Sequence, residues 1–226
     1  MQFAAGIFAG ILIGGWYAAT HRHRVAETAA EIMGKATILG AAVGMVASGA
    51  IVYWLARRMI RRNAGLSLAS LGWGPSTPRF LLGAAFFGAA IGILFLAFTI
   101  AVPMPQDAKA GQIARVIAHG GWPLYLWALL ALVIAPPVEE FVFRGMLWTG
   151  FSQSWGPVAS GIAATVAFVA LHIPEAGSYP PALVSITIMG VGALAARIVS
   201  GSLVPAIVLH ATYNTILVVA TLGSYA

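Results

Sequence analysis

The chain has 226 residues, of which 60% are hydrophobic and 8% are charged, and its mean hydropathy is +0.92. Soluble domains carry about 25% charged residues, so this composition excludes an ordinary water-soluble fold. The chain contains no cysteine, which excludes disulfides, thiolate metal ligands and cysteine nucleophiles. The composition therefore predicts a membrane protein whose chemistry depends on a small number of polar side chains.

Seven apolar segments follow one another along the chain, at residues 3–19, 36–56, 80–102, 122–148, 156–172, 181–199 and 203–222. A helix needs about 20 apolar residues to cross a bilayer, and the fourth segment is long enough to be tilted or broken. We therefore expect an all-α, polytopic membrane helix bundle with about seven, or seven to eight, transmembrane helices. Such a multi-pass protein would reside in the plasma membrane, or the inner membrane if the source is prokaryotic.

Glycines recur at every fourth position in three of these segments. They are Gly6, Gly10 and Gly14 in the first, Gly40 and Gly44 in the second, and Gly88 and Gly92 in the third. This spacing places small residues on one helix face, where a neighbouring helix can approach closely. We expect packing within one bundle rather than a dimer interface, and the sequence leaves the oligomeric state open.

Basic residues outnumber acidic ones, and the formal net charge is +6. Five arginines lie close to the junction of the second and third segments: Arg57, Arg58, Arg61, Arg62 and Arg79. Beside a bilayer such a cluster is explained by attraction to anionic lipid head groups, so no nucleic-acid partner is expected. The basic residues of the two sets of loops number six against five, which favours an amino terminus on the cytoplasmic side.

Polar and charged side chains inside apolar segments are functional hypotheses, because each charge costs at least about 2.5–3.5 kcal/mol on insertion. Those that need an explanation are Glu139, Glu140, Arg144, His172, His210 and Asn214. We therefore expect the functional site to lie among the fourth, fifth and seventh segments.

The two glutamates of the fourth segment follow two prolines directly. Pro136 and Pro137 suit a helix start, so we expect a new helix to begin just before the acids. Glu140 and Arg144 are four residues apart on one helix face and predict a structural ion pair. Glu139 points about 100° away from this pair and is the candidate general base.

Histidines end the fifth segment and occupy the middle of the seventh. His172 shares a helix face with Phe168, and His210 shares one with Asn214, because both pairs are four residues apart. One carboxylate and two imidazoles can bind zinc with an open water position. Without metal they can act as a base and an oxyanion donor set around a water molecule. Both arrangements predict hydrolysis.

Three motifs in this order resemble a known family. Glu139-Glu140-x-x-x-Arg144 followed by Gly, Phe168-x-x-x-His172 and His210-x-x-x-Asn214 are similar to the motifs of the CAAX-protease and bacteriocin-processing intramembrane peptidases. This family, also called CPBP or Abi, is related to the type II CAAX prenyl endopeptidases. The resemblance covers residues 124–222, and upstream only Leu71-Gly72-Trp73 is similar. It divides one integrated membrane domain into N-terminal helices and a polar loop at 1–121 and a CAAX-protease-like catalytic core at 122–226.

The resemblance implies an intramembrane endopeptidase acting near the membrane surface. Glu139 and His172 would activate water, and His210 and Asn214 would stabilise the oxyanion. Arg144 and Glu140 would hold the site together, with Phe168 in support. The substrate would be a peptide or protein, lipidated or membrane-associated, whose sequence and cleavage site stay open.

The candidate residues are compatible with a metal-free site and with a zinc site. We expect no cofactor, because an asparagine suits an oxyanion donor better than a zinc ligand. The alternative is Zn²⁺ held by Glu139, His172 and His210.

The predicted helix boundaries place Glu139 and His172 at different depths in the membrane, although they should share one site. Glu139 lies about 16 Å of helix from a loop near Gly150, whereas His172 lies about 24 Å from Gly156. A common site therefore requires the fourth helix to project beyond the bilayer or the fifth to tilt.

Two other functions are compatible with the same residues. A proton-coupled transporter could use intramembrane Glu and His as a relay, although no repeated halves are evident. A non-catalytic immunity or scaffold protein would keep the helices and tolerate loss of Glu139.

Overall fold

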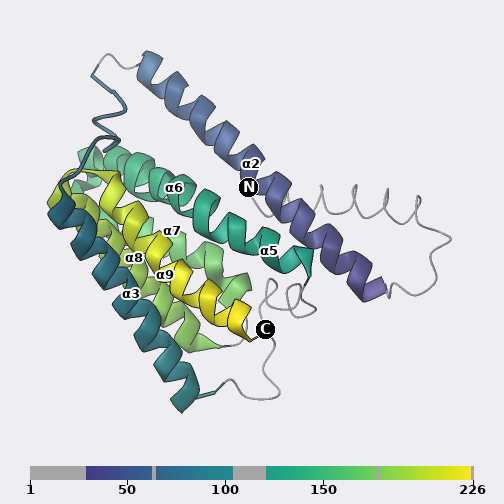
Figure 1. The fold of residues 1–226 in the computed structure, drawn as a ribbon. Coiled ribbons are helices and arrows are strands. Elements are labelled where there is room, and N and C mark those ends of the chain that lie inside the picture. Colours follow the sequence, from purple (N-terminus) through teal and green to yellow (C-terminus); the bar gives the residue numbers. More distant parts are fainter. Residues whose placement is uncertain (1–28, 63–64, 104–120, 177–178, 225–226) are drawn as a thin grey trace.

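The computed structural model describes residues 29–62, 65–103, 121–176 and 179–224, and within these ranges all regular structure is helical (Figure 1). The predicted all-α class is therefore confirmed for the described residues. The first predicted segment, 3–19, with Gly6, Gly10 and Gly14, lies outside them. So does most of the polar connection at 103–121.

The helical segments of the described chain follow one another in a simple order. They are α2 (Ala29–Arg62), α3 (Pro78–Ala101), α5 (Trp122–Leu129), η1 (Leu130–Ile134), α6 (Ala135–Glu140), η2 (Phe141–Leu147), α7 (Trp148–Ala176), α8 (Pro180–Ser200) and α9 (Leu203–Gly223). The segments η1 and η2 are π-helical turns inside one continuous run.

Five helices of the described chain are long and apolar enough to cross a membrane, fewer than the seven to eight that we predicted. The run Trp122–Ala176, of 55 residues, contains both the fourth and the fifth predicted segments. It is not straight, because Gly156 interrupts it with a φ of 76° and a ψ of 164°. The described residues thus contain fewer spans than predicted, because the first predicted segment lies outside them and the fourth and fifth fall in one helical run.

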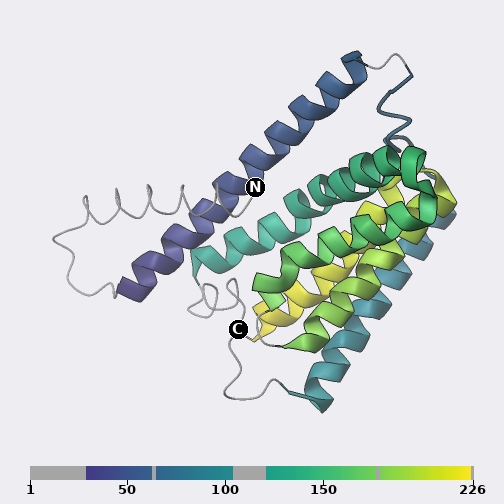
Figure 2. The ribbon, with the colours of Figure 1, turned by 180° about the vertical axis from the view of Figure 1, so that it is seen from behind.

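The helices α3, α8 and α9 lie side by side, and α7 packs against α8 (Figure 1). The α5–α6 run contacts α9, and α2 contacts α5 and α6 (Figures 1 and 2). Proline begins α3 and α8, where its missing N–H costs no helical hydrogen bond. Between α8 and α9, Gly201 takes a left-handed φ of 69°, and the Ser202 hydroxyl accepts a hydrogen bond from Val204 N–H at 3.1 Å.

Two glycines of α3 allow its close contact with α9. A Cβ atom added at Gly88 would collide with the carbonyl oxygen of Leu209, and one at Gly92 would lie 2.9 Å from Cβ of Ile216. The prediction that Gly88 and Gly92 serve packing within the bundle is therefore confirmed. Because Leu209 precedes His210, this contact also fixes the part of α9 that carries polar residues.

The connection before α3 packs into the bundle through Leu71-Gly72-Trp73. The carbonyl of Gly72 accepts a hydrogen bond from Leu203 N–H at 2.8 Å, and the Trp73 ring meets Phe141 edge-on at 5.9 Å. A side chain at Gly72 would collide with Arg197. This segment therefore joins the start of α9 to η2.

Replacing Gly88 by alanine should destabilise the fold, because the backbone of Leu209 cannot move away as a flexible side chain can. We expect a loss of about 1–3 kcal/mol, measured by thermal unfolding of the protein in detergent micelles. Gly83→Ala on the same helix is the matched control, since no atom lies within 4 Å of its added Cβ. Equal stability of the two variants would contradict the close contact.

Candidate active site

The reversal at Gly156 brings Glu139 and His172 to the same depth. Gly156 adopts a φ that favours glycine, and Pro157 begins the returning part of α7. Glu139 lies 17 residues before Gly156 and His172 lies 16 residues after it, so the two stretches of chain are nearly equal in length. The depth difficulty disappears because the chain turns at Gly156 and not near Gly150.

A fully buried ion pair lies at the inner end of the site. Arg144 Nη1 donates to Glu140 Oε1 at 3.0 Å, and neither side chain has any exposed surface. Arg144 Nη2 donates to the carbonyl oxygen of Gly190 on α8 at 2.8 Å. A Cβ at Gly190 would lie 3.1 Å from Nη2, so glycine allows α8 to approach the guanidinium. The charge of Arg144 is thus neutralised, and two of its nitrogens are hydrogen-bonded, by groups inside the protein.

His210 on α9 joins this pair. Its Nδ1 lies 2.9 Å from Glu140 Oε1, the same oxygen that accepts from Arg144. The ionised carboxylate of the pair can only accept, so Nδ1 carries the proton and donates. This bond fixes the orientation of the imidazole and turns Nε2 away from Glu140.

His172 is oriented in the same way by a different acceptor. Its Nδ1 donates to the carbonyl oxygen of Phe168 at 2.8 Å, because a carbonyl oxygen cannot donate. The Phe168 ring is fully buried, with its centroid 4.4 Å from the His172 ring and 5.8 Å from the His210 ring. The Arg144 guanidinium carbon also lies over Phe168, 4.5 Å from the centroid. Phe168 therefore packs against three polar residues of the site.

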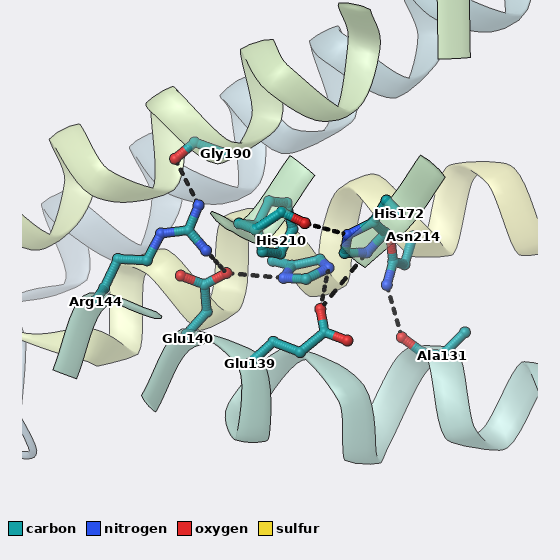
Figure 3. A network of polar contacts seen from close by, with 9 residues as sticks. Ala131, Glu139, Glu140, Arg144, His172, Gly190, His210 and Asn214 are labelled. Atoms are coloured by element: carbon teal, nitrogen blue, oxygen red, sulfur yellow. Dashed lines mark hydrogen bonds and ion pairs between the residues drawn. The ribbon is translucent and has the colours of Figure 1, made fainter. Parts of the chain in front are cut away.

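The two free histidine nitrogens face Glu139 (Figure 3). Glu139 Oε2 lies 3.8 Å from His172 Nε2 and 3.9 Å from His210 Nε2, and among the described residues this oxygen has no hydrogen-bond partner. These separations exceed those of direct hydrogen bonds. One carboxylate and two imidazoles from α6, α7 and α9 thus surround a common point.

Asn214 lies one turn after His210 and contacts the helix defect around Pro136. Ala135 N–H donates to Leu130 five residues back, and Pro136 has no N–H. The carbonyl oxygen of Ala131 therefore lacks the donors four and five residues ahead of it, and Asn214 Nδ2 donates to it at 2.8 Å (Figure 3). The prolines do open a new α-helical segment, but the chain stays helical through η1. This contact leaves the second N–H of the Asn214 amide for another acceptor.

Exposure increases along the polar network. The side chains of Glu140 and Arg144 are 0% exposed and His210 is 3% exposed, whereas Glu139 is 14% and His172 is 16% exposed. The site is therefore fully buried at the ion pair and partly exposed at Glu139 and His172, where Glu139 Oε2 itself is buried.

Glu175 is an acidic residue next to the site that the sequence reasoning missed. It lies three residues after His172 on α7, and its side chain is exposed. The spacing His172-x-x-Glu175 was the available signal, because side chains three apart share a helix face. It was overlooked because Glu175 lies beyond the predicted end of the fifth segment.

The described residues contain no group of three or more His, Asp or Glu side chains placed to hold a metal ion. In the zinc alternative, Glu139 Oε2 and the Nε2 atoms of His172 and His210 are the atoms that would hold the ion.

The model of the type II CAAX prenyl endopeptidase Rce1-like family matches residues 121–216. No curated protein matches the chain, and no solved structure does. The match lies close to the predicted stretch 124–222 and contains all of the site residues above. Residues 121–216 of this chain are therefore similar to the type II CAAX prenyl endopeptidase Rce1-like family.

Proposed function

We propose that this protein is an intramembrane endopeptidase that hydrolyses a peptide bond near the membrane surface. The observation that carries the proposal is the position of Glu139 Oε2, within 4 Å of two imidazole nitrogens. Both imidazoles are held by their other nitrogen, so the three atoms are oriented before any substrate binds. The family match supports the same class of reaction.

Water activation is the task of Glu139 and His172 in this proposal. Glu139 Oε2 and His172 Nε2 are both acceptors, and a water molecule has two O–H donors to offer them. A water bound in this way directs a lone pair toward the carbonyl carbon of the peptide. As its oxygen attacks, Glu139 takes one proton as general base.

The oxyanion of the tetrahedral intermediate needs donors, and His210 and Asn214 are the candidates. His210 donates from Nε2 only when both ring nitrogens carry protons, since its Nδ1 proton is bound to Glu140. Asn214 has the N–H that Ala131 does not use. Such donors are effective because they are fixed before charge develops.

The reaction ends when the carbon–nitrogen bond breaks. The proton taken by Glu139 passes to the leaving amine, so the products are a new carboxyl terminus and a new amino terminus. Glu140, Arg144 and Phe168 touch no reacting atom here. They hold His210 and His172 in place.

The substrate in this proposal is a peptide or protein that is lipidated or associated with the membrane. The side chains of Glu139 and His172 are partly exposed and those of the ion pair are not, which supports access to the site from the side of Glu139 and His172. The family and the apolar helices indicate an integral membrane protein, and we propose a multi-pass arrangement.

Replacing Glu139 by glutamine should lower the cleavage rate by about 10²–10⁴, because the amide cannot accept the proton of water. His172→Ala and His210→Ala should also abolish detectable cleavage while the protein stays folded. Peptides released by reconstituted protein would be identified by mass spectrometry, with thermal unfolding as the check on folding. Full activity of Glu139→Gln would remove Glu139 as the general base, whereas absence of cleavage by the wild type would favour the non-catalytic scaffold.

Asn214→Ala should lower the rate by about 10²–10³ if the amide donates to the oxyanion. Thr215→Val is the matched control on the same helix, because Thr215 is exposed and bonds only the carbonyl of Ala211. We expect Thr215→Val to cleave at the wild-type rate. An effect of Asn214→Ala on melting temperature alone, with an unchanged rate, would assign Asn214 to the Ala131 contact only.

Metal removal should leave activity intact in this mechanism, since no step depends on a metal ion. The experiment is a chelator series on reconstituted protein, followed by metal analysis of the stripped sample. Loss of cleavage that zinc restores would favour the alternative in which Glu139, His172 and His210 bind zinc.

A further inference from the structure

Arg197 is a second buried arginine of the described bundle, besides Arg144. It lies in the last turn of α8, and only 7% of its surface is exposed. Its guanidinium carbon lies 5.3 Å from the centroid of the Trp148 ring. A Cβ added at Gly72 would collide with Nε, Cζ and Nη2 of Arg197, so the guanidinium occupies space that a side chain at Gly72 would fill. The connection before α3 thus leaves room for this cation.

The two buried arginines differ in their partners. Arg144 donates to the carboxylate of Glu140 and to the carbonyl oxygen of Gly190. Within the described part of the chain Arg197 forms no hydrogen bond and no ion pair, and its Nε is buried without a partner. Burying a charge is costly unless an opposite charge and hydrogen bonds compensate it, and a ring contact such as that with Trp148 does so only in part. Arg197 therefore needs an anion that the described helices do not supply.

Two hydroxyl groups in the neighbouring segments are also buried without a partner. Six side-chain atoms of the described structure are in this state, of which three belong to the candidate active site. The other three are Ser76 Oγ, Thr149 Oγ1 and Arg197 Nε. Ser76 lies in the same connection as Gly72, and Thr149 follows Trp148 directly, so both belong to segments that contact Arg197. All three atoms can donate, and a phosphate group offers them several acceptor oxygens and a negative charge.

This end of the bundle has the features of a membrane surface. Here α8 ends and α3 and α9 begin (Figure 1). Exposed arginines follow along the nearby helix ends, namely Arg57, Arg58, Arg61 and Arg62 in α2 and Arg79 in α3. Trp73 and Trp155 are 47% and 58% exposed, and tryptophan rings favour the head-group layer. Phospholipid phosphates lie at that depth and are attracted by basic residues.

We propose that Arg197 is the centre of a site that binds the phosphate group of an anionic phospholipid. A guanidinium binds phosphate by paired hydrogen bonds from its planar set of N–H groups. Arg197 lies seven residues, about 10 Å of helix, beyond Gly190, whose carbonyl oxygen binds Arg144. The site is thus separate from the candidate active site, and the inference does not depend on the proposed peptidase function.

The test measures lipid binding by the full chain in neutral detergent micelles. Phosphatidylglycerol and phosphatidylcholine would be titrated separately, and native mass spectrometry would count the bound lipids. We expect the wild type to bind phosphatidylglycerol more tightly, because the choline group neutralises the phosphate of phosphatidylcholine. Arg197→Gln should weaken the binding of phosphatidylglycerol by about tenfold to a hundredfold, the range of a hydrogen bond to a charged group.

Arg58→Gln is the matched control. Arg58 is exposed, and its guanidinium carbon also lies 5.3 Å from the centroid of a tryptophan ring, that of Trp54. The variant removes the same charge from an exposed position, so we expect it to bind phosphatidylglycerol as the wild type does. Arg197→Lys keeps the charge but not the planar set of donors, so it should also bind more weakly than the wild type. It replaces Arg197→Gln in the comparison if thermal unfolding shows that Arg197→Gln does not fold.

Four results would overturn the inference. Wild-type affinity in both Arg197 variants would leave the guanidinium with a packing role only. An equal loss in Arg58→Gln would indicate diffuse attraction of the lipid to the basic end, and equal binding of the two lipids would remove the need for an anion. Displacement of the lipid by excess inorganic phosphate would assign the site to free phosphate. None of these measurements involves cleavage, so each of them leaves the peptidase proposal as it stands.

Discussion

The neutralisation of a buried arginine is the constraint on which the rest of the site depends. Arg144 is fully buried, and Glu140 supplies the opposite charge while Gly190 supplies a carbonyl oxygen. Because the same oxygen of Glu140 also accepts from His210, the ion pair holds η2, α6, α8 and α9 in one arrangement. Breaking such a pair by removing one partner costs about 3–5 kcal/mol, since it leaves a buried charge alone. The packing of these helices and the orientation of His210 are therefore set by one set of contacts.

The pair is not arranged for stability alone. Glu140 concentrates two hydrogen bonds on Oε1, while Oε2 of Glu140 and Nε of Arg144 have no partner in the described structure. An apolar pair of similar volume is often as stable as a buried ion pair or more so. What the charged pair adds is a fixed acceptor for His210, which aims Nε2 at Glu139. The orientation of one imidazole is thus a physical reason for burying two charges.

Contacts that depend on helical spacing could be predicted from the sequence. The four-residue interval gave the Glu140–Arg144 contact, and it also placed Gly88 on a face that α9 approaches. The depth of His172 could not be obtained in this way. It depends on where the chain reverses, and residues 148–155 are as compatible with a helix as with a loop. Glu175 was missed for a related reason, since α7 continues to Ala176, beyond the predicted end of its segment.

The orientation of Asn214 depends on a missing backbone hydrogen bond in a neighbouring helix. Spacing alone places its amide near His210, but the amide is also held by Ala131, whose carbonyl is open because Pro136 has no N–H. A side-chain amide with one N–H bound has its plane fixed, so the direction of the second N–H is fixed as well. In the proposed mechanism that second donor is the one that meets the oxyanion. The prolines that end one helical turn therefore orient a donor on another helix, and the value of such a donor lies in being fixed before the charge appears.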